Sequence, residues 1–135
     1  MHDETLMNIL SQNHVIAVVG MSPKPDRASH RVALYLRDHG YRIIPVNPGF
    51  HEILGETCYP DLESIPENEK VDIVDVFRKS EDTPPIAESA VRIGARVFWL
   101  QLGIANEVAA SIAESGGLIV VQDRCMKIEH ERLIG

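Results

Sequence analysis

The sequence has few cysteines, no long apolar run and no basic amino terminus. Cys58 and Cys125 are its only two cysteines, and they lack the paired spacing of a zinc site and the density of a disulfide-rich secreted domain. No apolar run approaches the ~20 residues that a transmembrane helix needs. The first residues include acids where a signal peptide needs bases. These absences predict a cytoplasmic protein.

Basic residues are also in deficit, at 13 against 20 acidic ones, for a formal net charge of -7. Such a chain is a poor non-specific ligand for nucleic acids. Positive charge is nevertheless gathered in residues 22–31, which contain Lys24, Arg27 and Arg31 and a single acid, Asp26. A local concentration of this kind allows an acidic protein to bind an anion.

Apolar runs of strand length alternate with segments of helical periodicity. We expect helices over 4–13, 29–40, 83–94, 106–117 and 126–133, and strands over 14–20, 41–48, 71–77, 95–103 and 118–123. Residues 52–67 are rich in loop formers, with one helical turn expected at 62–65. Ser29, Thr83 and Asn106 are the expected N-caps.

This alternation favours a parallel sheet with right-handed crossovers. A length of 135 residues suits one domain. We therefore predict a single doubly wound, mainly parallel α/β domain of Rossmann-like type over 1–135, with its core at about 15–133 and helices on both faces of the sheet. Ligands of such sheets bind beyond the carboxyl ends of the strands, at the switch point.

The loop after the first strand is a candidate anion site. It contains Gly20 but lacks the two further glycines of a dinucleotide-binding fingerprint. It leads into a helix amino terminus, where free N–H groups favour phosphate. Ser22 and Ser29 add hydroxyl donors, and Lys24 and Arg27 add charge. A solvated surface loop is the alternative interpretation.

The second strand ends in Asn47 and Pro48 rather than in the carboxylate that usually holds the ribose hydroxyls of NAD. A carboxylate would repel a phosphate on that ribose, whereas an amide would not. NADP and coenzyme A both fit this reasoning. A plain turn at these two residues is the alternative.

Further candidates follow the later strands. Phe77 can pack on an adenine, although core packing is the simpler role for a lone aromatic. Arg78 can stack on a base or pair with phosphate. Gln101 and Gly103 follow the fourth strand.

The stretches "GMSPKPDRASHRVALYLRDHGYRIIPVNP", "DIVDVFRKSEDTPPIAESAVRIGARVFWLQLGI" and "VQDRCMKIEHERL" resemble the small stand-alone CoA-binding proteins. These are single Rossmann-like domains similar to the CoA-binding domain of the succinyl-CoA synthetase α subunit. The resemblance extends from about Val15 to Leu133. It implies that coenzyme A lies across the carboxyl edge of the sheet.

The resemblance also implies roles for particular residues. The pyrophosphate would be cradled by Gly20, Ser22, Lys24, Arg27 and Ser29. The adenosine end would be bordered by Asn47, Pro48, Phe77 and Arg78, and the pantetheine by Gln101 and Gly103. It does not imply ligase activity, because the phosphorylated histidine of the synthetase belongs to a further domain with no matching position here.

Two other functions compete with a non-catalytic module that binds CoA or acyl-CoA. A small CoA- or NADP-dependent enzyme would use Cys125 and His130, with Arg124 lowering the pKa of the thiol. A plain interaction domain would need acids after the first strand, where this chain has bases. A homodimer is an expectation from base rates only, and the six histidines lack metal spacing. Asp75 is expected to face solvent or to cap a neighbour.

Overall fold

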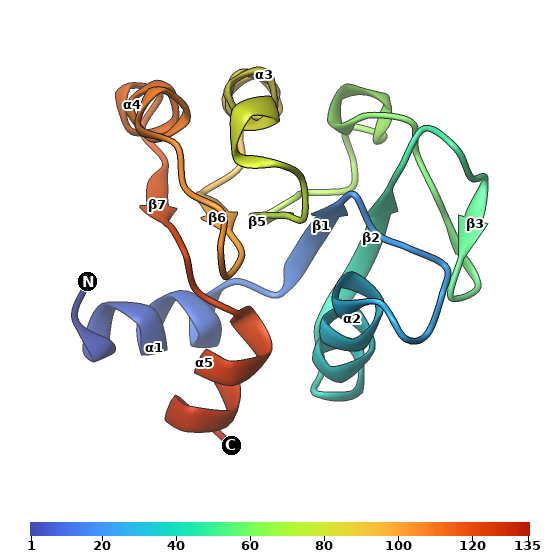
Figure 1. Ribbon diagram of the computed structural model, residues 1–135, viewed down its shortest axis with the longest axis horizontal. Coiled ribbons are helices and arrows are strands. Elements are labelled where there is room, and N and C mark those ends of the chain that lie inside the picture. Colours follow the sequence, from blue (N-terminus) through green and yellow to red (C-terminus); the bar gives the residue numbers. More distant parts are fainter.

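The computed structural model describes all of residues 1–135. Five parallel strands form one sheet in the order β2–β1–β5–β6–β7, between two layers of helices (Figure 1). The strands are β1 (Val15–Val19), β2 (Arg42–Val46), β5 (Ile73–Val76), β6 (Val97–Leu100) and β7 (Ile119–Val121), and the helices are α1 (Asp3–Gln12), α2 (Ala28–Asp38), α3 (Thr83–Arg92), α4 (Glu107–Ser115) and α5 (Met126–Leu133). The predicted single, doubly wound α/β domain is confirmed.

Apart from Asp75, the residues of the central strands are apolar, because helices cover both faces of these strands. In β1, residues 16–19 are all buried, and the same holds for 73–76 in β5 and 97–100 in β6. Alternate residues of each strand join different cores. Val18 and Trp99 pack in the layer of α1, α2 and α5, whereas Ala17 and Phe98 pack in the layer of α3 and α4.

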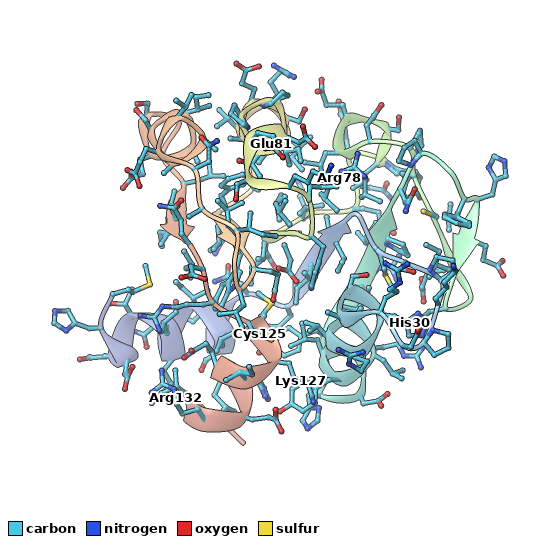
Figure 2. The ribbon with its side chains drawn as sticks, in the orientation of Figure 1. His30, Arg78, Glu81, Cys125, Lys127 and Arg132 are labelled. Atoms are coloured by element: carbon cyan, nitrogen blue, oxygen red, sulfur yellow. The ribbon has the colours of Figure 1, made fainter.

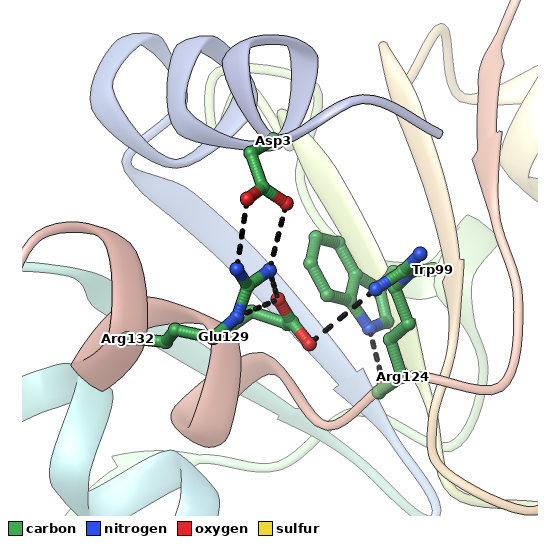
Figure 3. A network of polar contacts seen from close by, with 5 residues as sticks. All are labelled: Asp3, Trp99, Arg124, Glu129 and Arg132. Atoms are coloured by element: carbon green, nitrogen blue, oxygen red, sulfur yellow. Dashed lines mark hydrogen bonds and ion pairs between the residues drawn. The ribbon is translucent and has the colours of Figure 1, made fainter.

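The first and last helices are joined by a polar network (Figure 3). The buried carboxylate of Glu129 pairs with Arg132 and lies 3.5 Å from the guanidinium of Arg124. Arg132 also binds Asp3 through two contacts of 2.9 and 3.0 Å. The indole of Trp99 donates to the carbonyl of Arg124 at 2.8 Å. The network fixes α5 and the segment before it against the sheet and α1.

Two of the three expected N-caps are wrong. The N-cap of α2 is Arg27 and that of α3 is Asp82. The expected caps, Ser29 and Thr83, lie inside their helices because their hydroxyls bind elsewhere. The Ser29 hydroxyl accepts from the loop before α2, and that of Thr83 donates to a carbonyl in the turn η2 (Ser80–Asp82). Asn106 is confirmed as a cap, accepting from Ala109 N at 2.9 Å.

The expected loop-rich segment contains a small antiparallel hairpin, β3 (Glu52–Ile53) and β4 (Glu56–Thr57), which the sequence pattern did not predict. The helical turn expected after it is present as η1 (Leu62–Ser64). None of the helices is both long enough and apolar enough to cross a membrane.

Candidate functional site

The strand order brings the candidate loops to one edge of the sheet. β1 lies between β2 and β5, and its crossover helix α2 covers one face while α3, after β5, covers the other (Figure 1). The switch point therefore lies between the carboxyl ends of β1 and β5. The loop after Val19 and the segment after Val76 meet there.

The close approach of these two segments requires a glycine at position 20. Its φ is +83°, and a Cβ at this position would lie 2.4 Å from the carbonyl oxygen of Phe77. Its N–H donates to Val46 O in β2 at 2.8 Å. Any side chain here would therefore push the first loop away from the end of β5.

The loop between β1 and α2 is folded back onto the first turn of α2 through Ser22. The N–H of Ser22 donates to the Ser29 hydroxyl at 2.9 Å, and Ser22 O lies 3.0 Å from Nδ1 of His30. The Ser22 hydroxyl accepts from Lys24 N at 3.1 Å. Both main-chain polar groups of Ser22 are thus held by side chains of one helical turn.

The acceptor oxygens of this loop are largely occupied. Apart from the two prolines, every carbonyl oxygen of residues 21–27 accepts a hydrogen bond from within the chain: Met21 O from Asn47 Nδ2, Ser22 O from His30, Lys24 O from Arg27 N, Asp26 O from the Arg31 guanidinium, and Arg27 O from His30 N and Arg31 N. The acceptors left to repel an anion are the two proline carbonyls and the exposed carboxylate of Asp26.

Its donors, in contrast, are free. The main-chain N–H groups of Met21, Asp26, Ala28 and Ser29 have no partner in the chain. The hydroxyls of Ser22 and Ser29 each accept one N–H and donate to nothing, so their hydrogens remain available. The side chains of Lys24 and Arg27 are exposed and form no ion pair. This is the donor set that phosphate oxygens need.

Asn47 joins two of the edge loops. Its side-chain nitrogen donates to Met21 O at 3.0 Å, and its side-chain oxygen accepts from Gly49 N at 2.9 Å. The second contact is the local turn that we weighed as an alternative for Asn47 and Pro48. The first contact is not local, and it holds the β1 loop against the end of β2.

A cavity of about 200 Å³ adjoins the loop. Three of the predicted residues line it: Gly20, Pro48 and Arg78. The remaining lining is mainly apolar, and sequence reasoning missed it: Val19, Val46, Pro60, Asp61, Leu62, Pro85, Ile86 and Ser89. Pro60, which follows β4, and Pro85, in the first turn of α3, were the sequence features that could have indicated this lining. Arg78 lies on the α3 side of the sheet (Figure 2).

Three other predicted residues lie away from this cavity. Phe77 is half-buried and packs against the core on the α2 and α5 side, in agreement with the simpler role considered for it. Gln101 is buried, and its side-chain nitrogen lies 2.5 Å from Asp75 Oδ1. Gly103 is exposed, and its N–H donates to Asp123 Oδ1 at 2.6 Å.

Asp75 does not face solvent, contrary to one of our two expectations. Its side chain is fully buried in the central strand β5, and Oδ2 has no partner. Burial raises the pKa of this carboxyl to about 7, and the hydrogen bond from Gln101 opposes the shift. The chain therefore carries an acid that favours its neutral form, directly below the carboxyl edge.

The residues considered for nucleophilic chemistry are engaged elsewhere. Cys125 occupies the N-cap position of α5 without a side-chain cap hydrogen bond, and it packs half-buried against the core at the start of that helix (Figure 2). The guanidinium of Arg124 faces Glu129. His130 accepts or donates a hydrogen bond at 2.8 Å with the Tyr35 hydroxyl, and burial lowers the pKa of its imidazole. These contacts give each residue a structural partner.

A larger hollow, of about 810 Å³, lies at the opposite, amino edge of the sheet. It is lined by charged residues from 63–72 and 92–96, and two of them, Glu63 and Arg92, pair with each other at 2.8 Å. Its lining mixes both signs of charge. The smaller cavity is the candidate ligand site because Gly20 of the β1–α2 loop lines it and because parallel sheets bind ligands at their carboxyl edge.

Comparison with known families shows to which family the chain belongs. Residues 14–131 match the model of a family described as a CoA binding domain. The chain belongs to this family. The protein YneT of Bacillus subtilis is 43% identical to this CoA binding domain over 125 residues, which are 93% of this chain and 91% of YneT.

Solved structures agree with this kinship. A protein of Pyrococcus horikoshii OT3 superposes with a TM-score of 0.96 at 44% identity, covering 100% of this chain and 94% of that one. The dinucleotide-forming acetyl-coenzyme A synthetase 1 of Ca. Korarchaeum cryptofilum has a TM-score of 0.73 at 25% identity, over 84% of this chain and 27% of that protein.

One relative is a much longer enzyme. The ADP-forming acetate–CoA ligase I of Archaeoglobus fulgidus is 39% identical over 78 residues, which are 58% of this CoA binding domain and 11% of the ligase. The shared segment is thus a small part of that ligase.

Proposed function

We propose that this chain binds coenzyme A or an acyl-CoA at the carboxyl edge of the sheet, as a binding module without catalysis of its own. The observation that carries the proposal is the state of the β1–α2 loop: most of its main-chain carbonyls are occupied, while four main-chain N–H groups and two hydroxyl hydrogens are free. The most strongly charged part of CoA is its phosphates. A loop of this kind matches them and rejects a cation.

The diphosphate takes the amino terminus of α2 in this proposal. The free N–H groups of Ala28 and Ser29 point from the first turn of the helix, where the helix dipole also favours negative charge. Arg27 lies next to them and offers a bidentate guanidinium. Lys24 supplies a second unpaired charge on the same loop.

The adenosine end takes the cavity of about 200 Å³ beside Gly20. The prolines and aliphatic side chains of its lining suit the flat face of a base. Its one acid, Asp61, accepts hydrogen bonds from Ser64. Arg78 lies on its rim, and Asn47 ends the neighbouring strand without a negative charge. A phosphate on the ribose is therefore tolerated, which favours CoA and NADP over NAD.

Binding rather than reaction is proposed because the groups at this edge are donors and cations. Neither thiol is set up as a nucleophile. The buried thiol of Cys58 donates to the carbonyl of Asn47, and burial raises its pKa. Cys125 packs against the core, and the charge of Arg124 is paired with Glu129. The family match supports coenzyme A over NADP. Further support comes from the Archaeoglobus relative, whose name describes a CoA ligase.

Calorimetric titration tests the proposal. We expect CoA to bind, 3′-dephospho-CoA to bind more weakly, and NADPH to bind more weakly than CoA. Undetectable binding of both CoA and 3′-dephospho-CoA would remove the proposal. Tighter binding of NADPH than of CoA would instead indicate that the same loop binds NADP.

A further inference from the structure

The contact between His30 and Ser22 has a direction that the chemistry of its atoms determines. Nδ1 of His30 lies 3.0 Å from the carbonyl oxygen of Ser22. A carbonyl oxygen only accepts hydrogen bonds, so the hydrogen must be on Nδ1. His30 is buried in the first turn of α2, and this contact is its side chain's one hydrogen bond within the chain.

The contact acts together with that of the preceding residue. The Ser29 hydroxyl accepts the Ser22 N–H at 2.9 Å, so two consecutive side chains of α2 hold both main-chain polar groups of Ser22. Pro23 and Pro25 further restrict the segment between them. The loop is therefore closed on the helix by side chains of that helix, before any ligand is present.

We propose that His30 is a positioning residue for the anion-binding loop, acting as the Nδ1–H tautomer. This inference rests on the proposed function, since the loop is the one assigned to the CoA diphosphate. His30 serves the loop in two ways. It restrains Ser22, whose hydroxyl holds Lys24 N, and it covers a carbonyl oxygen that would otherwise repel a nearby phosphate.

Two substitutions separate this role from simple packing. His30→Asn carries an amide N–H that can take the place of Nδ1–H, whereas His30→Leu fills similar space without a donor. We expect His30→Leu to weaken CoA binding roughly ten-fold, because the partly buried Ser22 carbonyl loses its donor and the loop loses a restraint. His30→Asn keeps a donor, so its affinity should remain within about three-fold of the natural protein.

His39, the exposed C-cap residue of α2, provides a control at the other end of that helix. Its Nδ1 lies 2.7 Å from the carbonyl of Tyr35, at the carboxyl end of α2. His39→Leu removes a contact of the same kind far from the loop. We expect it to leave CoA affinity unchanged, whatever it does to thermal stability.

Two readouts on the ligand-free protein keep the inference separate from the proposed function. Long-range ¹H–¹⁵N spectra at pH 8, where histidine side chains are generally neutral, should show His30 protonated at Nδ1. Amide exchange at Ser22 and Lys24 should be slow in the natural protein and in His30→Asn, and faster in His30→Leu.

The outcomes are distinct. A His30 protonated only at Nε2, or loop amides unaffected by His30→Leu, would overturn the positioning role even if CoA binds. CoA affinity unchanged in His30→Leu would also overturn it and leave the proposed function intact. If the natural protein binds no CoA while the tautomer and exchange results hold, the proposed function fails and the role of His30 in ordering the loop stands.

Discussion

The side-chain nitrogen of Asn47 donates to the carbonyl oxygen of Met21 at 3.0 Å, which joins the end of β2 to the loop after β1. One amide therefore does two things at the candidate site. It holds two loops in register, and it places an uncharged group where NAD-binding sheets carry a carboxylate.

Asn47→Asp should weaken binding of CoA more than binding of 3′-dephospho-CoA. The carboxylate cannot donate to Met21 O, and it repels the 3′-phosphate that only CoA carries. Asn47→Ala, which removes the amide without adding charge, should weaken both ligands alike. Calorimetry with the two ligands measures the ratio; an Asp variant with an unchanged ratio would place the 3′-phosphate away from Asn47.

Arg27→Ala should weaken CoA binding by roughly 1–3 kcal/mol, the value of a charge-assisted hydrogen bond. Arg96 is a matched control because it is also exposed and lines the hollow at the amino edge. Arg96→Ala makes the same change in net charge, and we expect it to leave the affinity unaltered. Equal losses in both variants would show a general charge effect rather than a contact at Arg27.

Asp75→Asn should change how stability depends on pH. The pKa of Asp75 is raised from 3.8 to about 7, so the folded protein holds this proton more tightly than the unfolded chain. The stability that this contributes is full below pH 3.8 and is lost as pH rises to about 7. Relative to Asp75→Asn, the natural protein should therefore lose on the order of 4 kcal/mol between these limits.

Denaturant unfolding of both proteins at several pH values between 5 and 8.5 measures the part of this loss that lies above pH 5, about 3 kcal/mol. Groups other than Asp75 titrate in both proteins and cancel in the comparison. Parallel stability curves over this range would contradict the raised pKa and would mean that water or a rearranged partner reaches Oδ2 of Asp75.

Glu129→Gln should destabilise the protein by about 1 kcal/mol, because Arg124 and Arg132 lose a charged partner but are themselves partly exposed to water. Asp3→Asn removes the exposed end of the same network and should cost less. CoA affinity should be preserved in both. A larger effect at Asp3 than at Glu129 would show that the joining of α1 to α5 matters more than burial.

Sequence reasoning predicted the fold well because its signals are local. An apolar run that ends at Gly20 indicates a buried strand, and an amphipathic stretch that ends at Gly40 indicates a helix. Neither inference requires knowing which elements pack against it. The two-residue strands β3 and β4 were not predicted, because strands this short show no periodicity in the sequence. The caps at Ser29 and Thr83 failed because both hydroxyls found partners beyond their own helix ends.

The candidate site was predictable in part for the same reason. The basic composition of the loop from Gly20 to Ser29 identifies it as a candidate anion site in the sequence. The structure adds which of its atoms have no hydrogen-bond partner. The pairing of Gln101 with Asp75 could not be foreseen, because it depends on the register between β5 and β6. The apolar cavity likewise combines residues from five separate segments of the chain.

Mapping of amide chemical shifts on addition of CoA tests the central claim most directly. The assignment to the β1–α2 loop predicts the largest shifts at residues 21–29, with smaller ones around Asn47 and Arg78. The larger hollow at the amino edge of the sheet is the alternative binding site. Shifts confined to its lining, around Lys70 and Arg96, with residues 21–29 unmoved, would contradict the assignment.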